Sequence, residues 1–473
     1  MKSILLNLDS SSDKNLYEQV YEALKNDIVS GKLGKGTKLP SLRKLSADNG
    51  ISITTIDTAY SQLLVEGYIE SRPKSGYYVR ESIEEISGGS PDSEAEGIEA
   101  YLGEETSRSA RMASSDGKVV YDEKSFDFTR WKRCMNKVFN DHSRLLRTPA
   151  DVKGEPALRY ELAKHLYQSR GVKCTPEQII IGAGTQQLMI QLTRILKAIG
   201  VENALTEKPG YGPVRNIFKD EGFPLTEIPV NQSGIILEKL PSNIRSVVYV
   251  CPSNQFPSGA VMPAARRYEL IKWAKANDSY VLEDDYDSEL RYFGKPIPAM
   301  QGMDSDGRVI YLGAFSSTLF ASIKISYMVL PEELMKVFEE RKSLYAQTCS
   351  KAEQLCLSLY MEDGSYYAHI RKLRRLYSSK LDITMELFRK HGEGIIEAVN
   401  SQSGLAVMLK IRSQLPAAEL CRIAEQLGLT MKAVDDLCSD EEKVVYFYFY
   451  MVPESLLKII VKMFIQKVAP RKR

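Results

Sequence analysis

The apolar positions near the N-terminus predict three helices followed by a small hairpin. A first helix is predicted over residues 16–28, where apolar side chains recur at helical spacing: Leu16, Val20, Leu24 and Ile28. Ser41 and Ser52 are suited to cap a second and a third helix. Residues 68–79 then alternate like two short strands around a turn. Three helices and a two-stranded wing, in this order, predict a winged helix-turn-helix.

A larger region that begins near residue 118 has the pattern of an α/β fold. Helical patterns alternate there with five short runs rich in β-branched residues, at 178–184, 246–252, 279–285, 308–315 and 325–330. Such alternation predicts a mostly parallel sheet flanked by helices. A long helical stretch is predicted from about Pro331 to Lys390, and a smaller α+β unit over about residues 391–473.

The segment between these two regions has a different composition. Residues 81–105 contain many acidic residues, Gly, Ser and Pro but no Lys or Arg, which favours an acidic, flexible linker. A locally helical, solvated acidic segment is the alternative. The predicted organisation is therefore a winged helix over residues 1–80, a linker over 81–117 and a large domain over 118–473.

Composition narrows the class of protein. A chain of 473 residues exceeds what one core usually supports, and 43% hydrophobic with 26% charged residues is typical of globular proteins. The net charge of +2 means that any contact with nucleic acid needs a local basic patch. Seven scattered cysteines without a CxxC pair, no signal sequence and no long apolar run predict a cytoplasmic protein without a membrane span.

Residues 35–79 resemble the GntR family of winged helix regulators. The resemblance rests on the LPS-x-R start of the second helix (Leu39 to Arg43), a Thr-rich third helix, the EGYI turn and a Gly-containing wing. It implies binding to double-stranded operator DNA.

The resemblance also names candidate DNA contacts. Ser41 and Arg43 are expected to meet a phosphate, and Ser52, Thr54 and Thr55 open the helix expected in the major groove. The wing adds a further set: Arg72, Lys74 and Gly76. Ile53 stands where the family usually has an arginine, so one contact is missing or moved. The alternative interpretation is that Ser41 and Ser52 only cap helices.

The large region is similar to fold type I aminotransferases. The similarity covers residues 153–196 and continues through EKPGYGP, CPSNQFPSG, LEDDYDSE and YLGAFSSTLFASIKISYMVLP. A GntR-type DNA-binding domain joined to such a domain resembles the architecture of the MocR family. In that family a domain that binds pyridoxal phosphate senses an amino acid or a vitamin. Fold type I enzymes that resemble this domain are dimers, and members of the MocR family are usually head-to-tail dimers. The resemblance therefore implies a head-to-tail homodimer.

Several residues match the family's cofactor positions. Gly184, Thr185 and Gln186 match the phosphate cup after a strand, and Asp284 matches the carboxylate that keeps the pyridinium nitrogen protonated. Tyr286 is expected by the ring oxygen. Tyr211 is expected to stack on the ring face.

Other positions depart from the family. Ser317 stands where the lysine that forms the Schiff base belongs, and a hydroxyl cannot form that bond. Lys324 replaces the phosphate-binding arginine and Pro213 replaces another arginine, while residues 443–456, near the last strand, contain none for a substrate carboxylate. Arg215 is expected to point elsewhere.

These departures predict a DNA-binding regulator whose aminotransferase-like domain is not an enzyme. The domain is expected to sense a small ligand of the amino-acid or small-peptide class without covalent pyridoxal phosphate. Noncovalent binding of pyridoxal phosphate, or of its adduct with an amino acid, is the first alternative. An engineered Ser317 that traps a ligand and an active aminotransferase are more remote alternatives.

Overall fold

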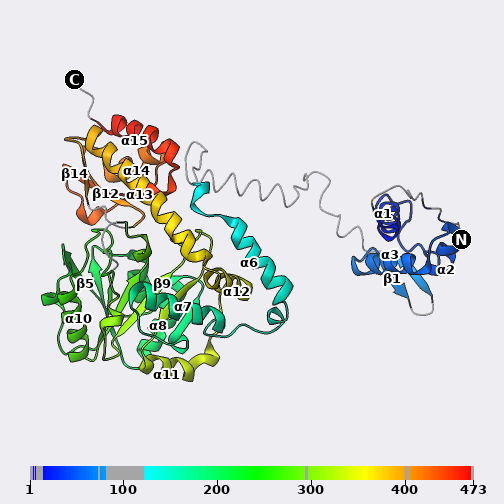
Figure 1. Ribbon diagram of the computed structural model, residues 1–473, viewed down its shortest axis with the longest axis horizontal. Coiled ribbons are helices and arrows are strands. Elements are labelled where there is room, and N and C mark those ends of the chain that lie inside the picture. Colours follow the sequence, from blue (N-terminus) through cyan, green and yellow to red (C-terminus); the bar gives the residue numbers. More distant parts are fainter. Residues whose placement is uncertain are drawn as a thin grey trace. The chain divides into compact units, whose positions relative to one another are not determined.

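The structure is a computed structural model that describes residues 14–72, 75–80, 122–292, 297–399 and 404–469, together with Ile4 and Leu6 (Figure 1). The contacts divide the chain into two units, residues 1–105 and 106–473, and each is described by itself. The predicted linker over residues 81–117 and the predicted contact Lys74 lie outside the described residues.

The N-terminal unit is a three-helix winged helix, as the apolar pattern predicts. Its elements are α1 (Leu16–Val29), α2 (Leu42–Asn49), α3 (Ile53–Val65), β1 (Ile69–Arg72) and β2 (Gly76–Val79). Ser41 Oγ accepts the Lys44 backbone N–H at 3.3 Å, and Ser52 Oγ accepts that of Thr55 at 3.1 Å, so both serines cap their helices. The two strands pair antiparallel to form the wing. A core of buried apolar residues holds the helices together, among them Val20, Leu24, Leu45, Ile56 and Tyr60.

The large unit is built on an eight-stranded sheet. Its strands are β3 (Ile179–Gly182), β4 (Asn203–Lys208), β5 (Leu225–Asn231), β6 (Gly234–Ile235), β7 (Ser246–Val250), β8 (Tyr280–Asp285), β9 (Val309–Ala314) and β10 (Ser326–Val329). The order across the sheet is β3-β10-β9-β8-β7-β4-β5-β6. Only β10 and β6 run antiparallel to their neighbours. The sheet is therefore mixed but mostly parallel.

Helices cover both faces of this sheet. They are α6 (Phe128–Asp141), α7 (Pro156–Arg170), α8 (Thr185–Ala198), α9 (Gly212–Asp220), α10 (Ala264–Ala276), α11 (Glu332–Arg341) and α12 (Lys351–Glu362). Tyr249 of β7 belongs to the same core as α8 and α9, whereas its neighbours Val248 and Val250 pack with α10. Because both of their faces are buried, β3, β7, β9 and β10 read as nearly continuous apolar runs, whereas β5 is largely accessible. The carboxyl ends of β7, β8 and β9 form the edge at which polar residues begin.

The predicted long helical stretch from Pro331 to Lys390 is wrong in one respect, because it is three separate helices. After α11 and α12 follows α13 (Ser365–His391). The chain leaves the helix over residues 342–350, and Gly364, with φ at 79°, turns it between α12 and α13. Helical periodicity continues on both sides of each break, so the pattern does not reveal them.

The C-terminal part is the predicted α+β unit. It contains β11 (Ile396–Val399), β12 (Val407–Arg412), α14 (Ala417–Gln426), β13 (Met431–Ala433), β14 (Glu442–Phe447) and α15 (Glu454–Val468). The four strands form an antiparallel sheet in the order β11-β12-β14-β13, packed on α13 and α15. In the part of the chain that the structure describes, no helix has the length and apolarity needed to span a membrane.

Candidate functional site

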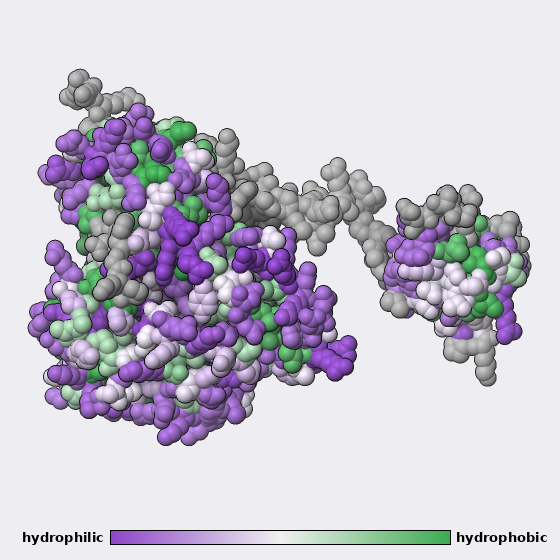
Figure 2. Space-filling model, in the orientation of Figure 1, coloured by the Kyte–Doolittle hydropathy of each residue, from purple (hydrophilic) through white to green (hydrophobic). Residues whose placement is uncertain are grey.

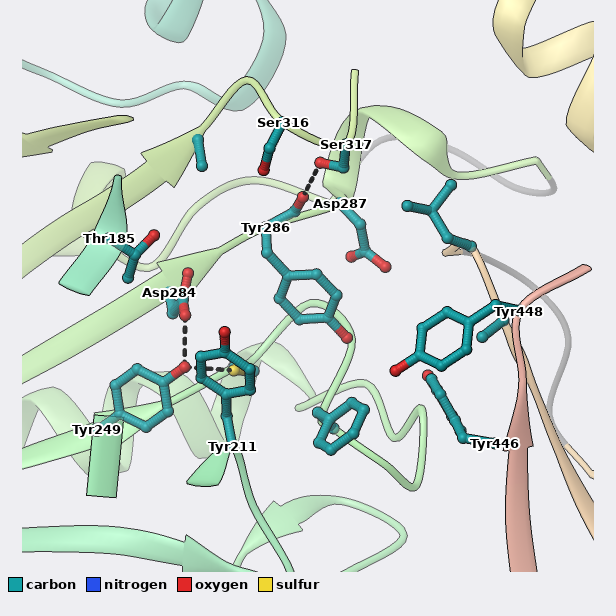
Figure 3. Close-up of a pocket in the computed structure, with 15 residues that line it drawn as sticks. Thr185, Tyr211, Tyr249, Asp284, Tyr286, Asp287, Ser316, Ser317, Tyr446 and Tyr448 are labelled. Atoms are coloured by element: carbon teal, nitrogen blue, oxygen red, sulfur yellow. Dashed lines mark hydrogen bonds between the residues drawn. The ribbon is translucent and has the colours of Figure 1, made fainter. Parts of the chain in front are cut away.

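A cavity of about 230 Å³ opens at the carboxyl ends of β7, β8 and β9 (Figure 3). This edge is where ligands bind in open α/β sheets, because the loops there leave a crevice between them. The large sheet and its loops supply most of the lining, and the C-terminal α+β unit closes one side with Leu405, Ala406, Tyr446 and Tyr448. The cavity is thus built from segments more than 200 residues apart in the chain.

The structure brings five of the eight predicted pocket residues together. Thr185, Tyr211, Asp284, Tyr286 and Ser317 line the cavity. Gly184 precedes α8 with φ at 93°, Gln186 is an exposed residue of the first turn of α8, and Lys324 is exposed; these three are outside the lining. The first turn of α8 therefore presents Thr185 to the cavity.

The carboxyl of Asp284 is buried in the cavity wall without a cationic partner among the described residues. Only 6% of the residue is exposed, and the Tyr249 hydroxyl donates a hydrogen bond to its Oδ2. Burial raises the pKa of Asp284 to about 7, and the hydrogen bond from Tyr249 only partly offsets this. The protonated form of Asp284 is therefore far more favourable than that of an exposed aspartate.

A second lining carboxyl, that of Asp287, is also buried and also has a raised pKa. It is 3% exposed and accepts a hydrogen bond from Asn254 Nδ2 at 2.5 Å, while burial raises its pKa to about 8. Asp285, outside the lining, is different. Burial is the largest influence and raises its pKa, but the ion pair with Arg170 Nε at 2.7 Å and the hydrogen bonds from Tyr311 and Ser288 together outweigh it and place the pKa below its usual value.

Ser317 and Tyr286 are held by backbone groups. Ser317 Oγ donates to the Tyr286 carbonyl at 2.6 Å (Figure 3). The Tyr286 hydroxyl donates to the Asn254 carbonyl at 2.9 Å. The hydroxyl that the resemblance places near a ring oxygen is therefore already used within the protein. Tyr211 is 39% exposed and lies edge-on to Phe256.

Sequence reasoning missed ten of the fifteen lining residues, among them Tyr249, Phe256, Asp287, Tyr446 and Tyr448. Asp287 is part of the LEDDYDSE motif, in which the family resemblance assigns a role only to the first aspartate and the tyrosine. The alternation of tyrosines at 446 and 448 is the signal that places both on one side of an extended segment. No Lys, Arg or His is among the described residues that line the cavity. Arg215 pairs with Glu227 at 2.7 Å and is not part of the lining, in agreement with the prediction that it points elsewhere.

The predicted DNA contacts lie on the surface of the winged helix. Arg43 and Thr54 are exposed, Thr55 Oγ1 lies 2.7 Å from Ser52 Oγ, and Ile53 is 48% exposed at the first position of α3. Of the predicted DNA contacts in the wing, the structure describes Arg72 and Gly76, which are opposite each other in the β1–β2 pairing. Arg72 contacts Glu70 Oε1 at 2.7 Å and its guanidinium lies over the Tyr78 ring.

Replacing Arg43 with alanine is expected to weaken binding to all DNA sequences by about tenfold and to lower the salt dependence of binding by about one ion. The reason is that an exposed guanidinium at the start of α2 is placed for a phosphate, which carries no sequence information. Fluorescence anisotropy with operator and random duplexes at several salt concentrations measures both quantities. Lys32→Ala, which removes an exposed charge in the turn after α1, is the control. Unchanged affinity would remove Arg43 from the interface.

Comparison with known proteins agrees with this architecture. The family model for bacterial regulatory proteins of the gntR family matches residues 16–79, and that for aminotransferase class I and II matches residues 115–463. Among solved structures, an archaeal alanine:glyoxylate aminotransferase superimposes with a TM-score of 0.67 at 20% identity, covering 78% of this chain and 95% of that one. This likeness shows the fold of the large unit.

Regulators that combine both domains are similar over most of the chain. The HTH-type transcriptional regulator YdeL of Bacillus subtilis is 37% identical over 437 residues, 90% of each chain. The probable rhizopine catabolism regulatory protein MocR of Rhizobium meliloti is 33% identical, over 90% of this chain and 87% of its own. The pyridoxine biosynthesis regulator PdxR of Corynebacterium glutamicum is 32% identical over 78% of each.

The fold and these similarities define a transcriptional regulator with a GntR-type DNA-binding domain joined to an aminotransferase-like domain. The chain belongs to the MocR family of such regulators.

Proposed function

We propose that this regulator senses a small ligand in the cavity of its aminotransferase-like domain, without covalently held pyridoxal phosphate, and that the ligand changes its binding to operator DNA. A ligand can do this only if it binds more tightly to one arrangement of the DNA-binding domains than to another. On this proposal the large domain is a sensor and not an enzyme.

The observation that carries the proposal is the position of Ser317. It lines the cavity where the family lysine belongs, and its hydroxyl is hydrogen-bonded to the Tyr286 backbone. No amine is present among the described lining residues, so the site does not fit a cofactor held through an imine bond. Transamination needs that amine as its proton carrier, which argues against an enzyme.

The direct test is a titration of the purified full-length protein with pyridoxal phosphate, with and without amino acids, followed by absorbance and calorimetry. The proposal expects no covalent adduct and no turnover of any amino donor. A thermal-shift screen of amino acids, small peptides and amines, repeated with operator DNA in an anisotropy assay, then tests sensing. If no small molecule changes either stability or DNA binding, the sensor role is excluded.

Replacing Ser317 with lysine is expected to produce a yellow protein that holds pyridoxal phosphate covalently. The new amine would lie in the cavity beside Tyr286 and Asp284, and borohydride reduction followed by mass spectrometry would locate the adduct on residue 317. Ser316→Lys is the matched control, because Ser316 also lines the cavity one position away. A colourless Ser317→Lys protein would show that the site has diverged beyond the lysine.

Noncovalent binding of pyridoxal phosphate, or of its amino-acid adduct, is the second candidate. The first turn of α8 at Thr185 offers N–H groups for a phosphate, and Asp284 offers a carboxyl for a pyridinium. Against it, no cation lines the cavity and the Tyr286 hydroxyl is used by Asn254. Saturable, borohydride-resistant binding in the titration would favour this candidate.

We also propose that the regulator acts as a head-to-tail homodimer on a repeated operator. The visible face of the large unit is mostly hydrophilic with separate hydrophobic patches (Figure 2). Large apolar side chains are exposed on α6 and α7, which both contact α12: Phe128, Phe139, Tyr160 and Tyr167. Exposed apolar groups of this size favour a protein partner. Sedimentation velocity would measure the oligomeric state.

A further inference from the structure

The cavity is lined by two carboxyl groups, and no cationic side chain is among the described residues that line it. Asp284 and Asp287 both line it, both are more than nine-tenths buried, and each has one oxygen hydrogen-bonded to a neutral donor. Neither Oδ1 atom has a hydrogen-bond partner among the described residues. A buried carboxyl that is only partly satisfied costs free energy, and a cation in the cavity would recover it.

The contrast with Asp285 shows that this is particular to the cavity. Asp285 lies between the other two aspartates in the chain, yet it accepts hydrogen bonds from Arg170, Tyr311 and Ser288. The protein therefore supplies a buried cation to the carboxyl that is outside the cavity. It leaves the two carboxyls that line the cavity without one.

Aromatic side chains form a large part of the remaining wall. Six of the fifteen lining residues are aromatic, and four of them form a row: Tyr211, Phe256, Tyr446 and Tyr448. Neighbouring rings in this row meet nearly at right angles, at 83°, 73° and 80°, with centroids 6.3, 5.0 and 5.6 Å apart. Rings set at right angles present both faces and edges to the same space, as in the aromatic cages that hold ammonium groups.

Figure 3 shows the Asp287 carboxyl on the side of the cavity where Tyr286, Tyr446 and Tyr448 gather. A carboxyl and the negative faces of aromatic rings attract the same kind of ligand, a cation with apolar substituents. A carboxylate or phosphate would instead be placed beside two buried acids.

We propose that the ligand of this cavity is an organic ammonium cation without a carboxylate, bound by Asp287 and the aromatic row. This inference rests on the proposed function, since it names the chemical class of the ligand that the sensor takes. It replaces the amino-acid and peptide class expected from the resemblance. A zwitterion brings a carboxylate for which the described lining has no cation.

Calorimetry on the full-length protein tests the charge requirement with three probes of similar shape. Choline carries a quaternary ammonium, and 3,3-dimethylbutan-1-ol is its neutral isostere. Glycine betaine keeps the trimethylammonium group but has a carboxylate in place of the hydroxymethyl group of choline. We expect choline to bind at least about tenfold more tightly than either of the others. Equal binding of the neutral isostere, tighter binding of glycine betaine, or no binding of choline would each overturn the proposal.

Two variants test the residues. Asp287→Asn keeps the shape of the side chain and removes its charge, and we expect it to weaken choline binding by about tenfold or more. Asp306→Asn is the matched control, because Asp306 pairs with Lys275 on the surface. Tyr448→Phe is expected to retain binding, whereas Tyr448→Leu, which removes the ring, is expected to lose it.

Thermal unfolding of each variant checks that it is folded, and the three-probe comparison needs no variant at all. The two proposals fail in different ways. If choline does not bind but an amino acid or peptide changes DNA binding, the cation inference falls and the sensor function stands. If no compound of any class changes DNA binding or stability, the sensor function falls as well.

Discussion

Replacing Arg170 with methionine is expected to destabilise the aminotransferase-like domain by about 3–5 kcal/mol. Arg170 ends α7, and its guanidinium pairs with Asp285 at 2.7 Å and donates to Ser253 Oγ at 2.6 Å and to the Ile297 carbonyl. Both charged side chains are buried. Removal of the arginine leaves Asp285 buried without its counter-ion, with hydrogen bonds only from Tyr311 and Ser288, and either its ionised or its protonated state then costs free energy.

Urea unfolding followed by tryptophan fluorescence measures this effect. The only two tryptophans of the chain, Trp131 and Trp273, lie in α6 and α10, so the signal reports the large domain alone. Arg422→Met is the control, because Arg422 forms an exposed pair with Glu419 on one helix and should change stability by less than about 1 kcal/mol. A loss of similar size in both variants would contradict the importance of the buried pair.

The stability of the ligand-free protein is expected to fall as the pH rises from about 4 to 8, in part because of the two cavity carboxyls. Burial raises the pKa of Asp284 to about 7 and that of Asp287 to about 8, from an ordinary value of 3.8. The folded protein therefore binds more protons than the unfolded chain in this window. Stability must then decrease as the pH rises through it.

Asp287→Asn isolates the contribution of one carboxyl. The variant should match the unmodified protein near pH 4 and be more stable at pH 8, by an amount on the order of 2 kcal/mol or more. The groups that face Asp287 are Asn254, Asp284, Asp285 and Arg170, and all remain in the variant. Thermal unfolding at several pH values gives the difference curve. A constant difference across pH would show that Asp287 titrates normally.

The predicted pH dependence connects the stability of the domain with its proposed ligand. A carboxyl that is costly to ionise in the empty cavity becomes ionised at a lower pH when a cation lies beside it. Binding of choline should therefore release protons near neutral pH. Calorimetry in buffers of different ionisation enthalpy would detect this release.

Much of the winged helix was predictable from local pattern. Ser41 and Ser52 cap α2 and α3 as expected, because a cap depends on one side chain and a backbone N–H three residues later. Five of the eight strands of the large sheet, β3 and β7 to β10, were predictable for a similar reason, whereas β4, β5 and β6 are not among the predicted runs. Strands buried on both faces are continuous apolar runs, and each run stands out from the helices around it.

The helices after β10 were harder to predict. The apolar periodicity runs from α11 through α13, and neither Gly364 nor residues 342–350 interrupt it strongly. The breaks are set by packing, since α12 lies in the core with α6 and α7 while the later part of α13 packs against α15. Propensity alone does not contain this information.

Within the cavity, chain position identified Thr185, Asp284 and Ser317, because each belongs to a short motif whose spacing is readable. The aromatic row was not readable in this way. The ring centroids of Phe256 and Tyr446 are 5.0 Å apart, although 190 positions separate the two residues in the chain. Only the packing of the C-terminal sheet against the large sheet brings them together.

The three aspartates of LEDDYDSE show most clearly what local sequence settles and what it leaves to the folded chain. The motif establishes that acidic side chains follow a buried strand at the ligand edge of the sheet. Which of them is neutralised depends on Arg170, which lies 115 positions before Asp285 and reaches it only when α7 packs on the sheet. Charge balance in a low-dielectric interior is a property of three-dimensional neighbours. For that reason only the tertiary structure distinguishes a structural ion pair from two carboxyls that line a cavity.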